Sequence, residues 1–379
     1  MEKQAECYEL SLAPDYVSNW TFNDAIRELI QNGIDQQTTN PNNEFAMSYD
    51  SLNNQLILRS PLSKLKRDTL LLGCSSKAND DETIGQFGEG YKIAALVLTR
   101  LGKTFTIYNN EKNEIWTCRF KNSTKWLHKL LAFYIEKSNT EKTGLDIVIG
   151  NVSWREYEEI ESDIWLNSGE YEWERIETKY GEILTDEQQE KRVYVNGLYV
   201  YTDEDMKYGF NFKPMYLKLE RDRKTCSSWD IGELTSKMIM EAVVSGEISL
   251  EEVSEMMSGN KTETYHFRFN KDSDDAKKLM KMLIDSFDAE NPVFSIPVYS
   301  QSQIDRVKIL GGKPVVVAES VANLLSEEIE NRIKILEESM PLNTLSLKDK
   351  LKMWLATYRS EIYKSAAIHE LEEIIDSIE

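Results

Sequence analysis

Three polar side chains of complementary chemistry share a helical spacing near the start of the chain. Apolar residues recur every three or four positions over residues 21–37, which predicts an amphipathic helix. On that helix Glu28, Asn32 and Asp35 lie within about 60° of one another, opposite the apolar stripe. A neutral amide oxygen can bind a hard cation such as Mg²⁺, and a carboxylate can polarise a water beside a terminal phosphate. The same spacing is typical of a solvated helix face, so both interpretations stay open at this point.

A glycine-rich turn lies further along the chain, directly before a second apolar helix predicted at residues 91–101. Its Gly85, Gly88 and Gly90 let backbone N–H groups approach an anion, and the following helix N-terminus adds donors and partial positive charge. Lys92, in the first helical turn, could add a point charge to the same phosphates. The glycine order is not that of the dinucleotide fingerprint, and no Walker-type loop occurs, so a structural lid or hinge is the alternative.

The elements that would position these two segments follow an α+β pattern. Strands are predicted in the first part of the chain at residues 44–49, 55–59, 104–108, 115–120, 132–136 and 145–149. Asn53-Asn54, between the first two strands, is typical of a hairpin turn. This order predicts helices on one face of a mostly antiparallel sheet, that is, an α/β sandwich over residues 1–153.

The rest of the chain divides into four further segments by composition. Residues 154–190 are acidic and contain three tryptophans, which predicts a connector that packs through its aromatic side chains. We expect an α/β domain at 191–259, a small α/β unit at 260–325 and a charged helical tail at 326–379. The predicted strands here are 192–201, 214–219, 266–269, 293–298 and 314–317, and the predicted helices are 230–244, 250–257, 274–287 and 320–325.

The composition disfavours several classes of function. The chain has 65 Asp and Glu against 45 Lys and Arg, a net charge of −20, so its body would repel nucleic acid unless a local basic patch exists. The four cysteines and three histidines are scattered, which argues against a disulfide framework, a zinc site or a histidine-based hydrolase. The chain starts without a secretory signal pattern, and no apolar run approaches the length of a bilayer span. We therefore expect a cytoplasmic protein with no membrane partner.

The two chemical segments together resemble the GHKL ATPase superfamily, whose ATP-binding domain has the Bergerat fold. The motifs that carry the resemblance are Glu28-Leu29-Ile30-x-Asn32-x-x-Asp35 and Ile84-Gly85-Gln86-Phe87-Gly88-x-Gly90. The second motif looks like that of the heat-shock chaperone members, whereas Gly73-x-Ser75-Ser76-Lys77 with Gly88-x-Gly90-Tyr91-Lys92 looks more like that of the MORC members. The resemblance covers residues 8–150 and continues more weakly through 190–245, where the superfamily often has a transducer domain.

The resemblance implies a site for ATP and Mg²⁺. Glu28 matches the general base, Asn32 the Mg²⁺ ligand, and Asp35 the last position of the same motif, near the nucleotide. The residues that match phosphate contacts are Gly85, Gln86, Phe87, Gly88 and Gly90, which end a lid formed by residues 74–84, and the MORC-like lysines Lys77 and Lys92. Nucleotide-driven lid closure and homodimerisation are implied in the same way.

Two features depart from the superfamily pattern, and one further contact stays open. Ser60 stands where an Asp normally reads the adenine amino group, and it offers a hydroxyl without a charge. The later Gly-Thr pair is reversed, so Thr143 either reaches the base through water or marks a strand-entry turn. In the transducer-like segment, Arg221, Arg223 or Lys224 is the expected catalytic cation at the γ-phosphate, with a solvated turn as the alternative.

Two functions of different classes follow from these observations. The first is a Mg²⁺-dependent ATPase with slow hydrolysis that acts on a protein or nucleic-acid partner, a protein being favoured over bare DNA by the negative charge. The second is a non-catalytic protein on the same scaffold that binds a protein partner through its acidic surface. The absence of the adenine-binding Asp favours the second, whereas Glu28 and Asn32 favour the first. A histidine kinase is disfavoured because no histidine lies on a helix positioned for phosphorylation.

Overall fold

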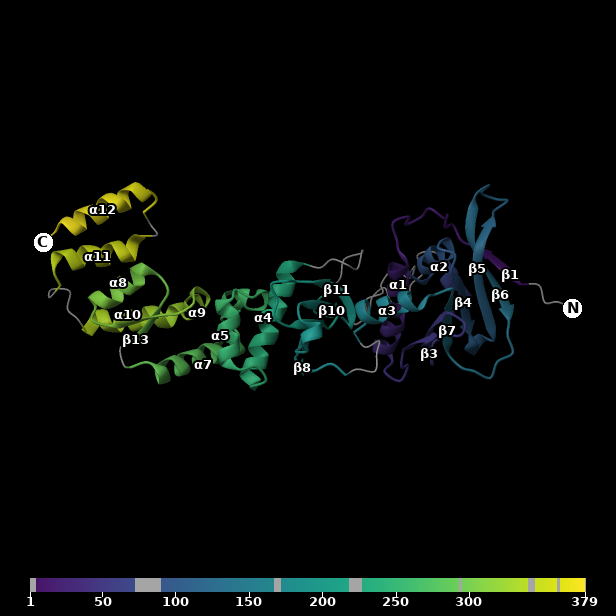
Figure 1. Ribbon diagram of the computed structural model, residues 1–379, viewed down its shortest axis with the longest axis horizontal. Coiled ribbons are helices and arrows are strands. Elements are labelled where there is room, and N and C mark those ends of the chain that lie inside the picture. Colours follow the sequence, from purple (N-terminus) through teal and green to yellow (C-terminus); the bar gives the residue numbers. More distant parts are fainter. Residues whose placement is uncertain are drawn as a thin grey trace. The chain divides into compact units, whose positions relative to one another are not determined.

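The computed structural model describes residues 5–71, 90–166, 172–217, 227–292, 295–339, 345–359 and 362–378. The chain divides into two compact units, the first made of Met1–Asp203 with Tyr208–Ser227 and the second of Glu204–Lys207 with Ser228–Glu379. Figure 1 colours the first unit purple to teal and the second green to yellow. None of the helices in the described ranges combines the length and the apolar character needed to cross a membrane.

The first unit is built on an antiparallel sheet, which has seven strands in the described residues. Its strands are β1 (Glu6–Glu9), β2 (Ala46–Asp50), β3 (Gln55–Ser60), β4 (Thr104–Asn109), β5 (Glu114–Asn122), β6 (Lys129–Lys137) and β7 (Leu145–Gly150). They are ordered β1-β6-β5-β4-β7-β3-β2. In β3 the alternation puts Leu56, Leu58 and Ser60 on the buried face, while the residues between them are half-buried. The predicted hairpin is confirmed, because β2 and β3 pair from Asp50↔Gln55.

Two helices, α1 (Phe22–Thr39) and α2 (Gly90–Arg100), cover the buried face of this sheet. α1 begins at a capping box in which the Thr21 side chain accepts from the Asp24 N–H and the Asp24 carboxylate accepts from the Thr21 N–H. Its Ile26 and Ile30 are fully buried and join Leu98 of α2 in one core with the sheet. Burial of this apolar stripe, worth about 25 cal/mol per Å², is what holds the two helices against the strands. The predicted arrangement of helices on one face of an antiparallel sheet is confirmed.

A second sheet in the same unit follows helix α3 (Trp154–Asp163). Its strands are β8 (Arg175–Glu177), β9 (Gly181–Leu184), β10 (Arg192–Val195), β11 (Leu198–Thr202) and β12 (Gly209–Phe212), ordered β11-β10-β12-β9-β8. The strand predicted at 214–219 is wrong in its described part, because residues 214–217 form a turn. Pro214 has no N–H to donate to a ladder, and the strand lies earlier, where Phe210 and Phe212 are buried.

The second unit is mainly helical. It contains α4 (Ser228–Ser245), α5 (Leu250–Ser258), α6 (Thr262–Tyr265), α7 (Asp274–Glu290), α8 (Gln301–Ile309), α9 (Glu319–Leu324), α10 (Ser326–Ser339), α11 (Leu347–Tyr358) and α12 (Ser365–Ser377), with β13 (Ser295–Val298) and β14 (Lys313–Val316) forming a parallel pair. The α+β class with a helical C-terminal region is therefore confirmed.

One predicted strand in this unit, residues 266–269, is wrong. Phe267–Phe269 is a short 3₁₀ helix directly after α6. The neighbours His266 and Phe267 are both buried, which a strand with one solvated face does not allow. His266 packs edge-on against Trp229, with ring centroids 4.4 Å apart, and this tertiary contact overrides the alternating pattern of the sequence.

Candidate functional site

The structure brings Glu28 and Asn32 of α1 against Gly90, the first residue of α2. A Cβ atom built on Gly90 would lie less than 3.0 Å from Glu28 Oε2 and 3.3 Å from Asn32 Nδ2. Real Cβ atoms do not approach another atom as closely as the first of these distances. The start of α2 therefore lies directly against the two residues that the sequence selects for chemistry, and a side chain at this position would displace the Glu28 carboxylate.

The polar triplet of α1 does not form a solvated helix face. Glu28 is 5% exposed and Asp35 is fully buried, so the solvated alternative is wrong for these two residues. Asn32 is half-buried, and its Nδ2 donates to the backbone oxygen of Glu28 at 2.8 Å. Because the amide nitrogen is held by the helix, the amide oxygen is the atom of Asn32 that remains for a ligand.

Lys92 is held by backbone carbonyls. Its Nζ donates to the carbonyl oxygens of Thr69 at 2.9 Å and Leu71 at 2.6 Å, and its side chain is fully buried. The neighbouring Tyr91 hydroxyl lies 3.0 Å from Thr69 Oγ1, and burial raises the pKa of Tyr91. These contacts fasten the first turn of α2 to the short 3₁₀ helix Arg67–Leu70, which precedes residues 72–89 in the chain.

The two residues expected near the base belong to neighbouring turns. Ser60 ends β3 on its buried face and pairs in register with Leu145 of β7. Thr143 is exposed, and Gly144 beside it has a φ of +79°. A Cβ on Gly144 would come under 3.0 Å from the Pro61 carbonyl oxygen, so the turn after Ser60 and the turn that contains Thr143 touch.

Sequence reasoning missed the residue that holds the turn after Ser60. Asn43 is 2% exposed, donates from Nδ2 to Ser63 Oγ at 2.7 Å, and accepts from the Leu62 N–H at 2.8 Å. It occurs in a polar run, Asn40-Pro41-Asn42-Asn43, that is typical of an exposed loop. No local signal distinguishes it from its neighbours, because its partners come from another part of the chain.

Eight of the predicted site residues lie outside the described residues. They are Lys77, Gly85, Gln86, Phe87, Gly88, Arg221, Arg223 and Lys224. The predictions for these positions stay predictions, and the site described here consists of the face that α1 and the start of α2 present to each other.

The helix that carries Glu28 and Asn32 is fastened to the second sheet of the same unit. Arg27 donates to the backbone oxygen of Tyr199 in β11, and Asn196 Nδ2 donates to Thr38 Oγ1 at 3.0 Å. Near the C-terminal end of α1, the ring centroids of Phe45 and Trp165 lie 5.1 Å apart. The position of α1 therefore depends on the second sheet as well as on the first.

A cleft of about 590 Å³ borders the C-terminal half of α1. It is lined by Ile34, Gln37, Thr38, Pro41, Phe45, Trp165, Arg175, Glu177, Gly181, Glu182, Asn196, Gly197, Asn211, Phe212 and Lys213. Three of its charged side chains are engaged within the protein, since Arg175 pairs with Glu182 at 2.9 Å and Lys213 donates to the Thr178 carbonyl at 3.1 Å. We assign no ligand to this cleft.

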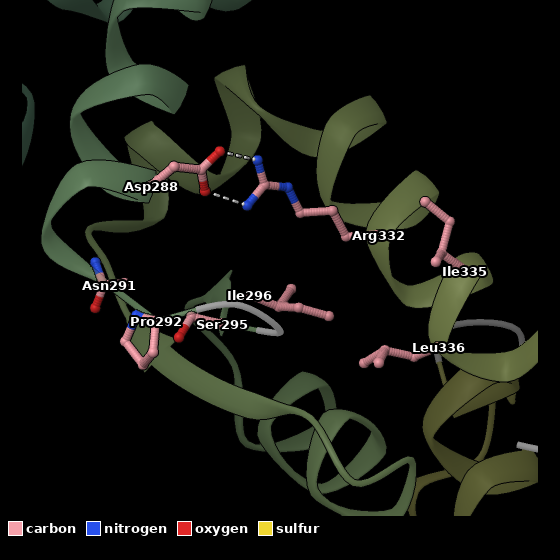
Figure 2. Close-up of a pocket in the computed structure, with 8 residues that line it drawn as sticks. All are labelled: Asp288, Asn291, Pro292, Ser295, Ile296, Arg332, Ile335 and Leu336. Carbon is pink, nitrogen blue, oxygen red and sulfur yellow. Dashed lines mark hydrogen bonds and ion pairs between the residues drawn. The ribbon is translucent and has the colours of Figure 1, made fainter. Parts of the chain in front are cut away.

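The second unit contains a pocket of about 370 Å³ between the end of α7, the start of β13 and α10, shown in Figure 2. The Arg332 guanidinium donates to both carboxylate oxygens of Asp288, at 2.7 and 2.9 Å, and lowers the pKa of that carboxyl. Ser295 also lines the pocket and is 4% exposed. Among the described residues, nothing forms a hydrogen bond with its Oγ. A buried hydroxyl without a partner destabilises the fold that contains it.

The Ser295→Ala variant should therefore be more stable than the wild type by about 1 kcal/mol, because the substitution removes a desolvated hydroxyl and leaves little empty volume. Ser236→Ala is the matched control, since Ser236 is fully buried and its Oγ donates to the Glu263 carbonyl at 2.9 Å. That variant should be less stable by about 1 kcal/mol. Urea unfolding of both variants measures the difference, and a loss of stability in Ser295→Ala would contradict the absence of a partner.

Comparisons with known proteins find one family model, one relative by sequence and a structural overlap. Residues 170–244, which include β8–β12, match the family model of the Mycoplasma pneumoniae MPN635 N-terminal domain. An uncharacterised protein of Mycoplasma pneumoniae is 28% identical over 222 residues, which cover 56% of this chain and 87% of that protein. The structure of the ATPase and transducer domains of DNA topoisomerase II from Balamuthia mandrillaris superposes with a TM-score of 0.31 and 13% identity, covering 52% of this chain and 67% of that chain. A structural overlap of this size carries no functional conclusion.

Proposed function

We propose that the chain binds Mg²⁺-ATP between α1 and the start of α2 and hydrolyses it slowly. The observation that supports this proposal is the approach of Gly90 to both Glu28 and Asn32. In this proposal Glu28 would serve as general base, Asn32 as an oxygen ligand for a hard cation and the α2 N-terminus as a phosphate site, three groups that nucleotide hydrolysis uses.

The residues present fit this cofactor pair. Because Gly90 has no Cβ, the Glu28 carboxylate lies directly against the start of α2, where a phosphate held by the helix N-terminus would meet it. Asn32 would hold Mg²⁺ through its amide oxygen, and the first N–H groups of α2 would donate to phosphate oxygens. Bound Mg²⁺ would supply neutralisation of the phosphate charge. Glu28 would accept the proton of the attacking water.

Regulation by a lid and by dimerisation belongs to the same proposal. Lys92 links the first turn of α2 to Thr69 and Leu71, just before the segment expected to form the lid. Contacts to the γ-phosphate would favour a closed arrangement of that segment over an open one, which is a shift of population. Opening would then limit turnover, so we expect a slow, regulatory ATPase that forms a homodimer.

The rival proposal is a non-catalytic protein on the same scaffold. It would bind a protein partner through its acidic surface and would bind nucleotide weakly or not at all. Ser60 in place of the expected Asp favours it, because a hydroxyl provides a weaker contact to adenine than a carboxylate. Titration calorimetry with ATP, followed by a phosphate-release assay, separates the two proposals.

The Asn32→Ala variant should bind Mg²⁺-ATP about ten-fold more weakly, or worse, because it loses an oxygen ligand of the metal. In the presence of EDTA, wild type and variant should bind ATP with equal affinity, since the metal is then absent from both complexes. Calorimetry with and without Mg²⁺ measures the effect.

Gln36→Ala serves as the control for this variant, because it removes an amide from the same helix one turn beyond Asn32 and should change neither affinity. An unchanged Mg²⁺-ATP affinity in Asn32→Ala would contradict the role as metal ligand.

A further inference from the structure

The loop between β5 and β6, Ser123–His128, is a well-defined structure that presents apolar side chains to solvent. The Ser123 N–H donates to the His128 carbonyl at 2.9 Å, and the Leu127 N–H donates to the Ser123 carbonyl at 3.0 Å. Ser123 Oγ also accepts from the Trp126 N–H at 3.3 Å, and Ser123 itself is 3% exposed. These bonds close the loop on a buried serine and leave Trp126 54% and Leu127 88% exposed.

Leu127 has a backbone conformation that leucine rarely adopts. Its φ is +52°, in the left-handed region where glycine and asparagine are favoured. A glycine at this position would form the same loop without the strain and without an exposed leucine. The loop therefore retains a side chain that lowers its stability, which is typical of residues kept for binding.

The surroundings of the loop are basic in a protein whose net charge is −20. Residues 115–135 contain Arg119, Lys121, Lys125 and Lys129 and neither Asp nor Glu. Lys121 is neutralised by Glu9 at 2.8 Å, and Arg119 stacks on the ring of Tyr134. Lys125 Nζ lies 4.8 Å from the ring centre of Trp126, and Lys129 Nζ lies 5.4 Å from that of Phe120, so both ammonium groups flank aromatic rings at the loop.

We infer that the Ser123–His128 loop binds single-stranded nucleic acid. Trp126 would stack on a base, Lys125 and Lys129 would contact phosphates on either side, and Leu127 would pack against the stacked base or its sugar. The charge complementarity is local, so it is compatible with an acidic body that repels nucleic acid elsewhere. The inference does not depend on the proposed ATP site, because nucleic-acid binding is measured without nucleotide.

An anionic membrane is the other partner that a basic loop with a tryptophan could meet. The observations favour nucleic acid for an electrostatic reason. A flat anionic membrane would be repelled by the body of the protein, whose net charge is −20, whereas a flexible single strand can contact the loop without approaching the rest of the surface. Lys125 beside the exposed ring of Trp126 also matches a stacking platform, in which a cation lies next to an aromatic face.

Fluorescence anisotropy of labelled oligo(dT) with the full chain tests the inference. The Trp126→Ala variant should bind about ten-fold more weakly, because one stacking contact is lost. In the Lys125→Gln/Lys129→Gln variant, the slope of log K against log salt should fall by about 1.4, since each phosphate contact on a single strand contributes about 0.7.

The Leu127→Gly variant separates binding from folding. It should melt at the wild-type temperature or above it, because the strain is relieved, and yet bind oligo(dT) about three-fold more weakly. Leu52, which is 92% exposed in the turn between β2 and β3, provides the matched control: Leu52→Gly should leave oligo(dT) binding unchanged.

Several results would overturn the inference. They are no binding of oligo(dT) by the wild type at 50 mM salt, unchanged affinity in Trp126→Ala, and equal or tighter binding of duplex DNA. Binding to phosphatidylserine vesicles in place of oligo(dT) would overturn it as well, and would assign the loop to a lipid surface.

Discussion

The Glu28→Gln variant should hydrolyse ATP at least about 100-fold more slowly than the wild type while binding Mg²⁺-ATP with an affinity within about three-fold. Glutamine has nearly the size of glutamate, so it can occupy the same buried position beside Gly90. It cannot accept a proton from the attacking water, and general-base catalysis contributes about 10²–10⁴-fold to such reactions. Phosphate release gives the rate, and calorimetry gives the affinity.

A carboxylate elsewhere on the same unit controls for a general loss of charge. Glu156 caps α3 and pairs with Lys103 Nζ at 2.7 Å, beyond the C-terminal end of α2. Despite the opposing effect of desolvation, hydrogen bonds from Lys103 and Ser153 lower the pKa of Glu156. Glu156→Gln should therefore cost stability but not turnover. Retained hydrolysis in Glu28→Gln would exclude Glu28 as the base, and a parallel loss of affinity would assign it a role in binding instead.

The two helices of the site were predictable because their sequence signals are local. The apolar spacing over residues 21–37 predicts a helix, and α1 runs from Phe22 to Thr39. The glycine that opens the second predicted helix is the first residue of α2. Periodicity and caps act over a few residues, so they can be read without knowledge of the rest of the fold.

The burial of Glu28 was not predictable in the same way. Helix periodicity places it opposite the apolar stripe, where side chains are usually solvated. It is buried because the start of α2 packs over it, and because Arg27 beside it bonds to Tyr199 of a sheet that begins far along the chain. The polar face is covered by elements distant in sequence, and no local pattern encodes that contact.

Lys92 illustrates the same limit. Its place in the first turn of α2 is apparent from the sequence, but the partners of its ammonium group are not. The carbonyls that accept its hydrogen bonds are those of Thr69, in the short 3₁₀ helix Arg67–Leu70, and of Leu71, the residue directly after it. A lysine that satisfies buried carbonyls and one that binds phosphate cannot be distinguished by their position in a motif.

Under the proposed function, the links from α1 to the second sheet would carry the effect of nucleotide binding beyond the site. A ligand held by Asn32 would act on a helix that is bonded to β11 through Arg27 and, about three turns further along, through Thr38 to Asn196. Residues 170–244, which match a separate family model, contain the partners of these bonds. Under the proposed function, a displacement of α1 would therefore shift residues 170–244 first. Packed elements transmit such shifts through direct contacts.

The Gly90→Ala variant should lose at least about ten-fold in Mg²⁺-ATP affinity, and hydrolysis with it, with a change of less than about 1 kcal/mol in the free energy of unfolding. The added Cβ meets Glu28 Oε2, the far end of a flexible side chain that can rotate away. The fold therefore tolerates the methyl group, but the space beside Asn32 and the geometry of the carboxylate are lost. Calorimetry, phosphate release and urea unfolding measure the three quantities.

Gly33→Ala is the informative comparison, because it adds the same methyl group to α1 in a place where it meets an aromatic ring instead of the end of a flexible side chain. Its Cβ would lie under 3.0 Å from three ring atoms of Phe45, a buried side chain that packs against Trp165. Overpacking of this kind costs about 1–3 kcal/mol, so this variant should lose stability first. The two glycines then have separate reasons to lack a side chain: Gly33 for packing and Gly90 for a ligand. If Gly90→Ala keeps the ATP affinity and turnover of the wild type, the absence of a side chain at Gly90 does not serve a ligand. That result would contradict the proposed nucleotide site.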